Sequence, residues 1–276
     1  MSEIFREGLL DGQVAIVTGG GSGIGRVTAI ELASLGARVV VFGRRDEPLQ
    51  ETVALAADGR CTAVVCDIRE EDQVDAAVDE VLGRHGRIDA LVNNAGGQFL
   101  APAETITPKG FRTVMRLNVE GTWLMTHAVA TKAMIPQGGG KVISVTLSPH
   151  HGLPGMAHSS AARAAVENLM RVLSIEWARF GIRLNAVAPG QIGTDTFMTK
   201  YPQSIVDAAA STIPLGRLGR PEEIAWTIAH LVSPAGDFTS GAVVTVDGAR
   251  DNHLGGWPTA HETGADGAPV AEQRRP

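Results

Sequence analysis

The chain has 276 residues, of which 44% are hydrophobic and 20% are charged, values that exclude a disordered or collagen-like chain and are typical of a soluble globular protein. Its net charge of −6 gives no reason to expect a nucleic-acid partner. No apolar run approaches the ~20 residues that span a bilayer, and the first residues lack the pattern of a signal peptide. We therefore expect a cytoplasmic protein with no membrane partner.

The cysteine and tyrosine counts limit the chemistry further. Cys61 and Cys66 lie an odd number of residues apart within one expected strand, so they should face opposite sides of it and remain unpaired. Two cysteines without a metal-ligand spacing fit a reducing compartment, and we expect no metal site. Tyrosine occurs once in the chain, so a tyrosine general acid has a single candidate, Tyr201.

Short apolar segments alternate with longer helical segments between Gln13 and about Gly248. The expected strands are Val14–Val17, Arg38–Phe42, Thr62–Cys66, Ala90–Val92, Lys141–Thr146, Arg183–Val187 and Ala242–Val246. The expected helices are Ile24–Leu35, Glu47–Ala57, Glu71–Arg84, Phe111–Met134, Ala161–Phe180 and Pro221–Val232. The strands are nearly all apolar, as in a sheet covered on both faces. The alternation predicts an α/β fold with a doubly wound, seven-stranded parallel sheet and helices on both faces.

No linker interrupts this alternation, so residues 1–250 should form one domain. The C-terminal tail, residues 251–276, differs from it because it is rich in glycine and proline. The tail is either a poorly ordered end or an arm that packs on a partner subunit through Leu254 or Trp257.

A glycine-rich turn separates the first expected strand from the first expected helix. Its residues are Thr18, Gly19, Gly20, Gly21, Ser22, Gly23, Ile24 and Gly25. Glycines let the backbone turn sharply and approach a pyrophosphate, and the helix N-terminus then offers unpaired N–H groups and a positive dipole end. A turn without a ligand is the alternative. Its position after the first strand of a doubly wound sheet favours a Rossmann-type dinucleotide site formed by Thr18, Gly19 and residues 21–25.

Arg44 and Arg45 follow the second expected strand, where a site for NAD(H) carries an acidic side chain for the ribose 2′-hydroxyl. Guanidinium groups instead match a phosphate. The sequence therefore favours NADP(H) over NAD(H), although both arginines can also be solvated loop charges.

The spacing Thr-Gly-x-x-x-Gly-x-Gly resembles the short-chain dehydrogenase/reductase family, and the resemblance extends over residues 11–250. Further matching positions are Asn93-Asn94-Ala95-Gly96, Asn118, Pro189-Gly190 and Val246-Asp247-Gly248. The resemblance implies additional cofactor contacts from Asp67, Ile68, Asn94, Ala95, Gly96, Arg163, Pro189, Gly190 and Ile192. It also implies a homodimer or homotetramer that is assembled through the helices expected at 111–134 and 161–180.

Carbonyl reduction in that family uses a Ser, an Asn and the pattern Tyr-x-x-x-Lys. An ungapped match places Ser159 at the Tyr position, Arg163 at the Lys position and Thr146 at the Ser position, and it retains Asn118. A serine hydroxyl is a much weaker acid than a phenol, whose pKa is ~10. Arginine still binds ribose hydroxyls but does not shuttle protons. The usual acid for ketone reduction is therefore missing.

The segment from His158 to Arg163 and the ending from Val246 to Arg250 resemble the peroxisomal-type trans-2-enoyl-CoA reductases and, more loosely, the 2,4-dienoyl-CoA reductases. The dienoyl resemblance is weaker, because Ser148 stands where those relatives carry a tyrosine. The resemblance implies NADPH-dependent reduction of the C=C bond of an acyl thioester, in which the enolate oxygen needs hydrogen bonds more than full protonation. The alternatives are a ketone/alcohol oxidoreductase with an atypical site and a catalytically silent NADP(H)-binding protein.

The resemblance also makes residues 191–215 a substrate lid, whose apolar side chains suit an acyl substrate. Tyr201 lies in this lid and is a candidate proton donor beside Asn118, Thr146, Ser159 and Arg163. Three histidines flank the catalytic segment: His150, His151 and His158. We expect one of them to pack and two to face solvent, with a proton relay through His158 as the alternative.

Overall fold

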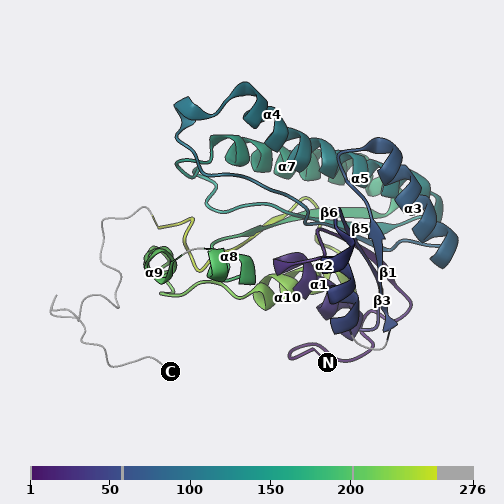
Figure 1. Cartoon of the computed structure of the whole chain (residues 1–276). Coiled ribbons are helices and arrows are strands. Elements are labelled where there is room, and N and C mark those ends of the chain that lie inside the picture. The colour runs from purple at the N-terminus through teal and green to yellow at the C-terminus, as the bar shows by residue number, and fades with distance from the viewer. Residues whose placement is uncertain (1, 57–58, 201, 254–276) are drawn as a thin grey trace.

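The computed structural model describes residues 2–56, 59–200 and 202–253. Its centre is a parallel sheet in the order β3-β2-β1-β4-β5-β6-β7, with helices on both faces (Figure 1). The strands are β1 (Val14–Thr18), β2 (Arg38–Gly43), β3 (Cys61–Val65), β4 (Ala90–Asn93), β5 (Gly140–Val145), β6 (Ile182–Pro189) and β7 (Val243–Val246). The strand order reverses direction between β1 and β4. The predicted fold class is confirmed.

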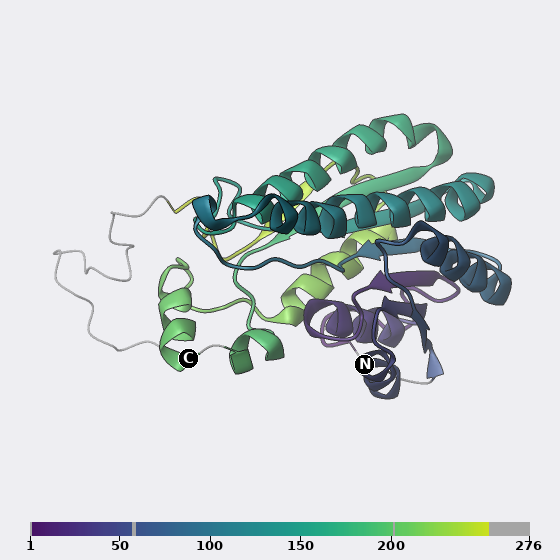
Figure 2. The ribbon, with the colours of Figure 1, turned by 45° about the horizontal axis from the view of Figure 1, so that its top comes forward.

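Alternate side chains of each central strand enter different cores, which explains why the strands read as continuous apolar runs. In β1, Ile16 belongs to one buried cluster, and Ala15 and Val17 belong to the other. The first cluster is covered by α3 (Glu71–His85), α5 (Gly121–Val129) and α7 (Ala157–Glu176). The second is covered mainly by α1 (Gly23–Ser34) and α10 (Pro221–Val232), with α2 (Asp46–Leu55) at its edge. Figure 2 shows the two helical layers on opposite sides of the sheet.

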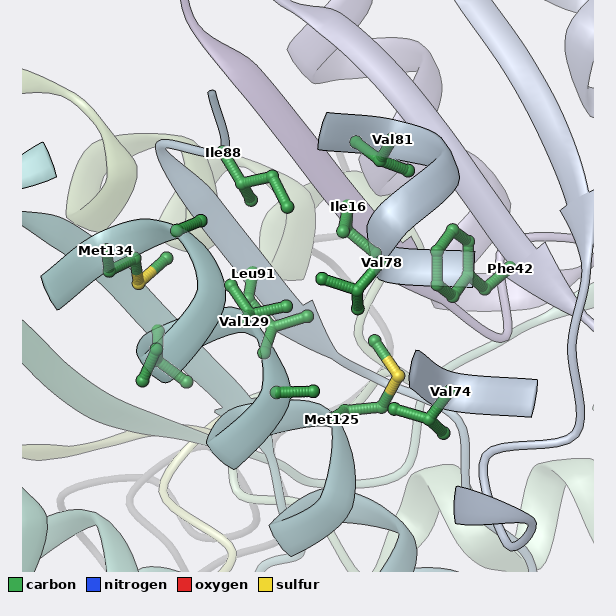
Figure 3. Close-up of a cluster of buried hydrophobic side chains, with 14 of the residues drawn as sticks. Ile16, Phe42, Val74, Val78, Val81, Ile88, Leu91, Met125, Val129 and Met134 are labelled. Atoms are coloured by element: carbon green, nitrogen blue, oxygen red, sulfur yellow. The ribbon is translucent and has the colours of Figure 1, made fainter. Parts of the chain in front are cut away.

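Apolar residues from three elements meet in the first cluster (Figure 3). Val74 and Val78 of α3 lie next to Met125 of α5, and Phe42 of β2 packs beside them. Cys66 lies in this cluster, whereas Cys61 lies in the second, and both are free. The expectation that the two cysteines face opposite sides and stay unpaired is therefore confirmed.

The helix expected at 111–134 is part of a continuous helical stretch from Pro108 to Gln137. It contains α4 (Pro108–Met115), a π turn η3 (Arg116–Glu120), α5, a second π turn η4 (Ala130–Met134) and α6 (Ile135–Gln137). It begins at Pro108, three residues earlier than predicted, because the Thr107 side chain accepts a hydrogen bond from Gly110 N and Pro108 fits the first helical position. The described part of the chain also contains three single-turn 3₁₀ helices: η2 (Ala103–Thr105), η5 (Ala178–Phe180) and η6 (Pro234–Gly236).

Two short helices that sequence periodicity did not identify occupy the expected lid. They are α8 (Asp195–Lys200) and α9 (Gln203–Ser211), and they lie beside the main layers in both views (Figures 1 and 2). Val206 and Ile213 are buried, so part of the apolar lid surface packs against the protein. Tyr201, Leu254 and Trp257 lie outside the described residues. No helix in the described part of the chain is long and apolar enough to cross a membrane.

Candidate active site

A cavity of about 540 Å³ lies at the carboxyl ends of the strands, beside the reversal of strand order between β1 and β4. Ligands of doubly wound sheets bind at this switch point. The lining includes every predicted cofactor residue except Thr18 and Gly25: Gly19, Gly21, Ser22, Gly23, Ile24, Arg44, Arg45, Asp67, Ile68, Asn94, Ala95, Gly96, Arg163, Pro189, Gly190 and Ile192. The predicted residues thus converge on one site.

The glycine-rich turn leaves no room for side chains at two positions. Gly19 has φ of +65°, and a Cβ there would lie 2.9 Å from Ala95 Cα. A Cβ on Gly25 would overlap the Gly19 carbonyl oxygen, so glycine lets the start of α1 pack directly on the turn. The backbone can therefore approach a pyrophosphate closely at the N-terminus of α1, which supports the predicted dinucleotide site.

Hydrogen bonds between Thr18 and the segment that begins at Asn94 fix the position of the glycine-rich turn. Thr18 is fully buried, and its Oγ1 accepts hydrogen bonds from Asn94 N and Ala95 N at 3.0 Å each. Asn94 Nδ2 donates to Thr18 O at 3.0 Å. These bonds join the ends of β1 and β4, so Thr18 supports the cavity without lining it.

Sequence reasoning missed two side chains that fix the same turn. Arg26 Nη2 donates to Gly21 O at 2.6 Å and to Glu51 Oε2 at 2.5 Å. Thr52 Oγ1 donates to Gly20 O at 2.8 Å. Arg26 carries no motif of its own, and its partner Glu51 lies on α2, so only the folded arrangement of α1 and α2 identifies the pair.

The second cluster of predicted contacts lies where β2 and β3 end. Arg44 and Arg45 are exposed at the cavity and form no ion pair with the described residues. Asp67 pairs instead with Arg69, whose Nε lies 2.9 Å from Asp67 Oδ1. The hydrogen bond from Arg69 lowers the pKa of Asp67, and the charge of Arg44 acts in the same direction. The two arginines are therefore free to meet an anion, while the Asp67 carboxylate already has a partner.

Thr146 and Arg163 line the part of the cavity where β5 ends. Arg163 Nη1 donates to Val145 O at 2.8 Å. Burial lowers the pKa of Arg163 to about 10, so the guanidinium still carries its charge at neutral pH. Gly96 packs directly against it: a Cβ at Gly96 would overlap Arg163 Nη2 and lie 2.7 Å from Asn118 Oδ1. Arg163 is fixed, charged and available to a cofactor in this cavity.

Asn118 lies in the first π turn and is fully buried outside the cavity lining. Its Nδ2 donates to Gly97 O and Val114 O, each at 2.8 Å, and its Oδ1 accepts from Gly97 N at 3.2 Å. π turns often occur at functional sites. Here the turn places Asn118 so that its side chain fixes the backbone at Gly97. Gly97 follows Gly96, which packs against Arg163.

Ser159 is the predicted catalytic residue whose surroundings differ most from the expectation. The first turn of α7 begins at Ala157, four residues before the predicted start, and it carries Ser159 into the interior. Ser159 is fully buried, lies outside the cavity lining, and its Oγ has no hydrogen-bond partner among the described residues. The neighbouring His158 is also fully buried and meets the Phe99 ring edge-on, with centroids 4.2 Å apart.

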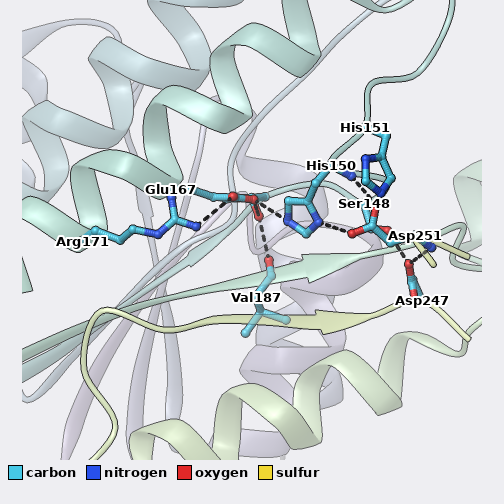
Figure 4. A network of polar contacts seen from close by, with 9 residues as sticks. Ser148, His150, His151, Glu167, Arg171, Val187, Asp247 and Asp251 are labelled. Carbon is cyan, nitrogen blue, oxygen red and sulfur yellow. Dashed lines mark hydrogen bonds and ion pairs between the residues drawn. The ribbon is translucent and has the colours of Figure 1, made fainter. Parts of the chain in front are cut away.

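A polar network behind Thr146 was not predicted from the sequence (Figure 4). The buried carboxyl group of Glu167 contacts His150, which in turn contacts Asp251. Thr146 contacts the same carboxyl group from the cavity. Of the three flanking histidines, His158 packs and His151 is exposed, as expected, whereas His150 lies between two carboxylates. The described residues contain no group of three or more His, Cys, Asp or Glu that could hold a metal ion.

Comparisons with known proteins agree with this architecture. A family model described as enoyl-(acyl carrier protein) reductase matches residues 19–249. The chain is 35% identical over 247 residues to a probable 2,4-dienoyl-CoA reductase, (2E)-enoyl-CoA-producing, of Bacillus subtilis, which covers 87% of this chain and 97% of the relative. It is 35% identical over 243 residues to the 3-oxoacyl-(acyl-carrier-protein) reductase FabG of Thermotoga maritima, with 87% and 98% covered.

Among solved structures, a citronellol catabolism dehydrogenase of Pseudomonas aeruginosa PAO1 is 43% identical and superposes with a TM-score of 0.82 over 91% of this chain and 100% of that one. The sequence motifs, the cavity at the switch point of the sheet and the similar proteins all indicate the same family. The chain belongs to the short-chain dehydrogenase/reductase family and is an oxidoreductase that uses a nicotinamide cofactor.

Proposed function

We propose that this protein is an NADPH-dependent reductase of the C=C bond of α,β-unsaturated acyl thioesters of the trans-2-enoyl type. One observation carries the proposal: Thr146 and Arg163, which stand at the family's Ser and Lys positions, border the cavity, and no phenol accompanies them among the described residues. A phenol has a pKa of ~10 and protonates a carbonyl oxygen far more readily than a hydroxyl does. The site therefore favours a reaction that does not need a strong oxygen acid.

The described residues fit the cofactor. The cradle at Gly19 and the N-terminus of α1 would hold the pyrophosphate. Arg44 and Arg45 would hold the ribose 2′-phosphate, which distinguishes NADPH from NADH. Arg163 would bind the nicotinamide ribose hydroxyls. When bound, the nicotinamide supplies the hydride.

Reduction of a C=C bond conjugated to a thioester leaves an enolate, whose oxygen is stabilised by hydrogen bonds. Thr146 lines the cavity and is our first candidate donor to the enolate. Ser159 is the second, and its unpartnered, buried hydroxyl is satisfied only by a group that enters from outside the described chain. Contact between Ser159 and a substrate requires the residues that cover it to move. Asn118 holds the Gly97 backbone in place, and Tyr201 stays a candidate donor from the lid at 191–215.

The names of the relatives support two reactions. The Bacillus subtilis relative is a probable dienoyl-CoA reductase and the family model describes an enoyl-thioester reductase, whereas the Thermotoga maritima relative reduces a 3-oxoacyl group. Equal identity to the two relatives makes ketone reduction the second candidate. We favour C=C reduction because Ser159 and Arg163 replace the tyrosine and lysine on which carbonyl reduction in this family depends.

We also propose a homodimer or homotetramer, as the family resemblance implies, and a cytoplasmic location, which is consistent with the two unpaired cysteines. Exposed apolar side chains on α5 and α7, Trp123, Val172 and Ile175, are consistent with an interface between copies.

The proposal is tested by following NADPH oxidation with crotonyl-CoA, a longer trans-2-enoyl-CoA and a panel of ketones. We expect turnover with the enoyl thioesters and little with the ketones. The Ser159→Ala variant should reduce enoyl thioesters more slowly, without loss of stability, because the change removes an unsatisfied buried hydroxyl. Turnover with ketones alone would refute the proposal, and NADPH binding without any turnover would favour a silent binding protein.

A further inference from the structure

The Thr146 side chain at the cavity is bonded to a carboxyl group behind it. Thr146 Oγ1 donates to Glu167 Oε1 at 3.0 Å and also lies 3.3 Å from the carbonyl oxygen of Val187. A hydroxyl has one proton to donate and two lone pairs that accept. A proton that Thr146 gives to a substrate can be replaced along the same contact once Glu167 itself receives a proton.

Glu167 is a carboxyl group in an unusual place, since only 5% of the residue is exposed. Burying a carboxylate is costly unless it is paired or hydrogen-bonded. Besides Thr146, its partners are His150 Nε2, 3.1 Å from Oε1, and the more distant Arg171 Nη2, 3.7 Å from Oε2. A glutamine would accept the same hydrogen bonds from Thr146 and His150 without burying a charge. A carboxyl group can in addition take up and release a proton, which an amide cannot do.

His150 connects Glu167 to the surface. Its side chain is 30% exposed, and its Nδ1 lies 2.5 Å from Asp251 Oδ2, while its backbone N–H donates to Asp251 Oδ1 at 2.6 Å. Burial alone lowers the pKa of His150, but the hydrogen bond to Asp251 and the charges of Glu167 and Asp251 outweigh it, so the pKa is raised. His150 thus holds its proton closer to neutral pH than a free histidine does.

The other charged groups near His150 are His151 and Asp247, and both contact Asp251. His151 Nε2 is 3.9 Å from Asp251 Oδ1, and Asp247 accepts from both Ser148 Oγ and Asp251 N. Asp247 thereby fixes the position of Asp251. The chain of contacts from the cavity to solvent is continuous: Thr146, Glu167, His150.

We infer that Thr146, Glu167 and His150 form a proton relay from solvent to the inner end of the cofactor cavity, an inference that rests on the proposed function. Hydride addition at C3 of the enoyl thioester leaves an enolate, and its C2 must gain a proton. The Thr146 O–H bond breaks as the C2–H bond forms; protonated His150 passes its Nε2 proton to Glu167 as Glu167 passes a proton to Thr146 Oγ1, so the carboxylate is regenerated, and solvent reprotonates His150. One hydride and one proton enter for each double bond reduced.

The test compares the full-length wild type with Glu167→Gln and His150→Gln on crotonyl-CoA across a range of pH. Wild-type kcat should fall as pH rises through the raised pKa of His150, because the relay needs the protonated imidazole. Glu167→Gln should lower kcat on the order of 100-fold and leave the KM for NADPH unchanged. In His150→Gln the falling limb of the pH profile should disappear together with most of the activity.

Arg171→Gln is the matched control, because it removes the 3.7 Å ion pair to Glu167 and leaves the relay intact. It should keep both kcat and the pH limb. NADPH binding reports whether each variant is folded. If Glu167→Gln does not fold, the His150→Gln variant tests the relay alone, because the His150 side chain is partly exposed and its replacement disturbs the core less.

The outcomes separate the relay from the proposed function. If Glu167→Gln and His150→Gln both kept the kcat and the pH profile of the wild type, the relay would be overturned, whereas the proposed enoyl reduction would not be affected. Turnover of ketones alone would overturn the proposed function, and the same variants on the ketone would then decide the relay. Absence of turnover on every substrate would overturn both.

Discussion

Arg44 and Arg45 carry the prediction of cofactor choice at the scale of single residues. Both are exposed at the cavity, and neither has an ion-pair partner in the described part of the chain. Replacing both by alanine should weaken NADPH binding by tenfold or more and leave NADH binding unchanged, because only NADPH carries the 2′-phosphate. Titration of each cofactor by fluorescence measures the two dissociation constants.

Arg84→Ala is the control, since it removes the same charge from an arginine that pairs with Glu80 on α3, away from the cofactor cavity. It should leave the preference for NADPH intact. Equal loss of NADPH and NADH affinity in the double variant would contradict the assignment of these two arginines to the phosphate.

Most of the residues predicted to bind the cofactor line one cavity, because the signal that identified them is local: glycines in a turn and charges at a strand end. Sequence reasoning could not anticipate the surroundings of Ser159 or the partner of Thr146. Ser159 is buried because α7 starts at Ala157, and Thr146 meets Glu167 only because β5 and α7 pack together. Contacts of this kind depend on tertiary structure, which a single sequence does not display.

At the scale of elements, the start of α10 offers a test by pH. Arg220 N donates to Glu223 Oε2 at 2.7 Å, and Arg217 binds the same carboxylate at 2.7 and 2.9 Å. The hydrogen bond from Arg217, aided by the Arg220 backbone and both charges, lowers the pKa of Glu223 from 4.5 to about 2. Because the folded-state pKa is lowered, the carboxylate stabilises the fold above about pH 4.5, and this contribution is lost as pH falls toward 2.

We therefore expect Glu223→Gln to lose less free energy of unfolding between neutral and acidic pH than the wild type does. Urea denaturation at neutral pH and near pH 3 measures the difference. Glu80→Gln is the control, because Glu80 meets only Arg84 in an exposed pair on α3. If wild type and Glu223→Gln lost the same free energy on acidification, the cap at α10 would not contribute as described.

The elements themselves were predictable where apolar periodicity is strong. All seven strands lie within two residues of their predicted bounds, since buried strands read as apolar runs. The two π turns at 116–120 and 130–134 were not predictable, because they insert a residue into the helical register without any change of composition. Apolar periodicity did not predict helices α8 and α9, because both helices are short and few of their residues are buried.

At the scale of the whole molecule, the reversal of strand order at β1 and β4 gathers segments that are far apart in sequence around one cavity. The glycine turn after β1, the arginines after β2, Gly96 after β4 and Thr146 after β5 all lie at the carboxyl edge of the sheet. This edge carries the residues predicted to bind the cofactor, whereas helix α7 carries Arg163 and Glu167. The predicted cofactor residues thus surround one cavity, and the proposed function assigns proton transfer to residues other than a tyrosine and a lysine.

The central claim is that hydride goes to carbon in a C=C bond and not to a carbonyl carbon. It is tested most directly by incubating the protein with crotonyl-CoA and NADPH that carries deuterium at the transferable C4 position, followed by mass spectrometry and NMR of the product. The account predicts butyryl-CoA with one deuterium at C3 and a solvent-derived hydrogen at C2. Crotonyl-CoA recovered unchanged, while a 3-oxoacyl thioester gives the 3-hydroxy product with deuterium at C3, would contradict it.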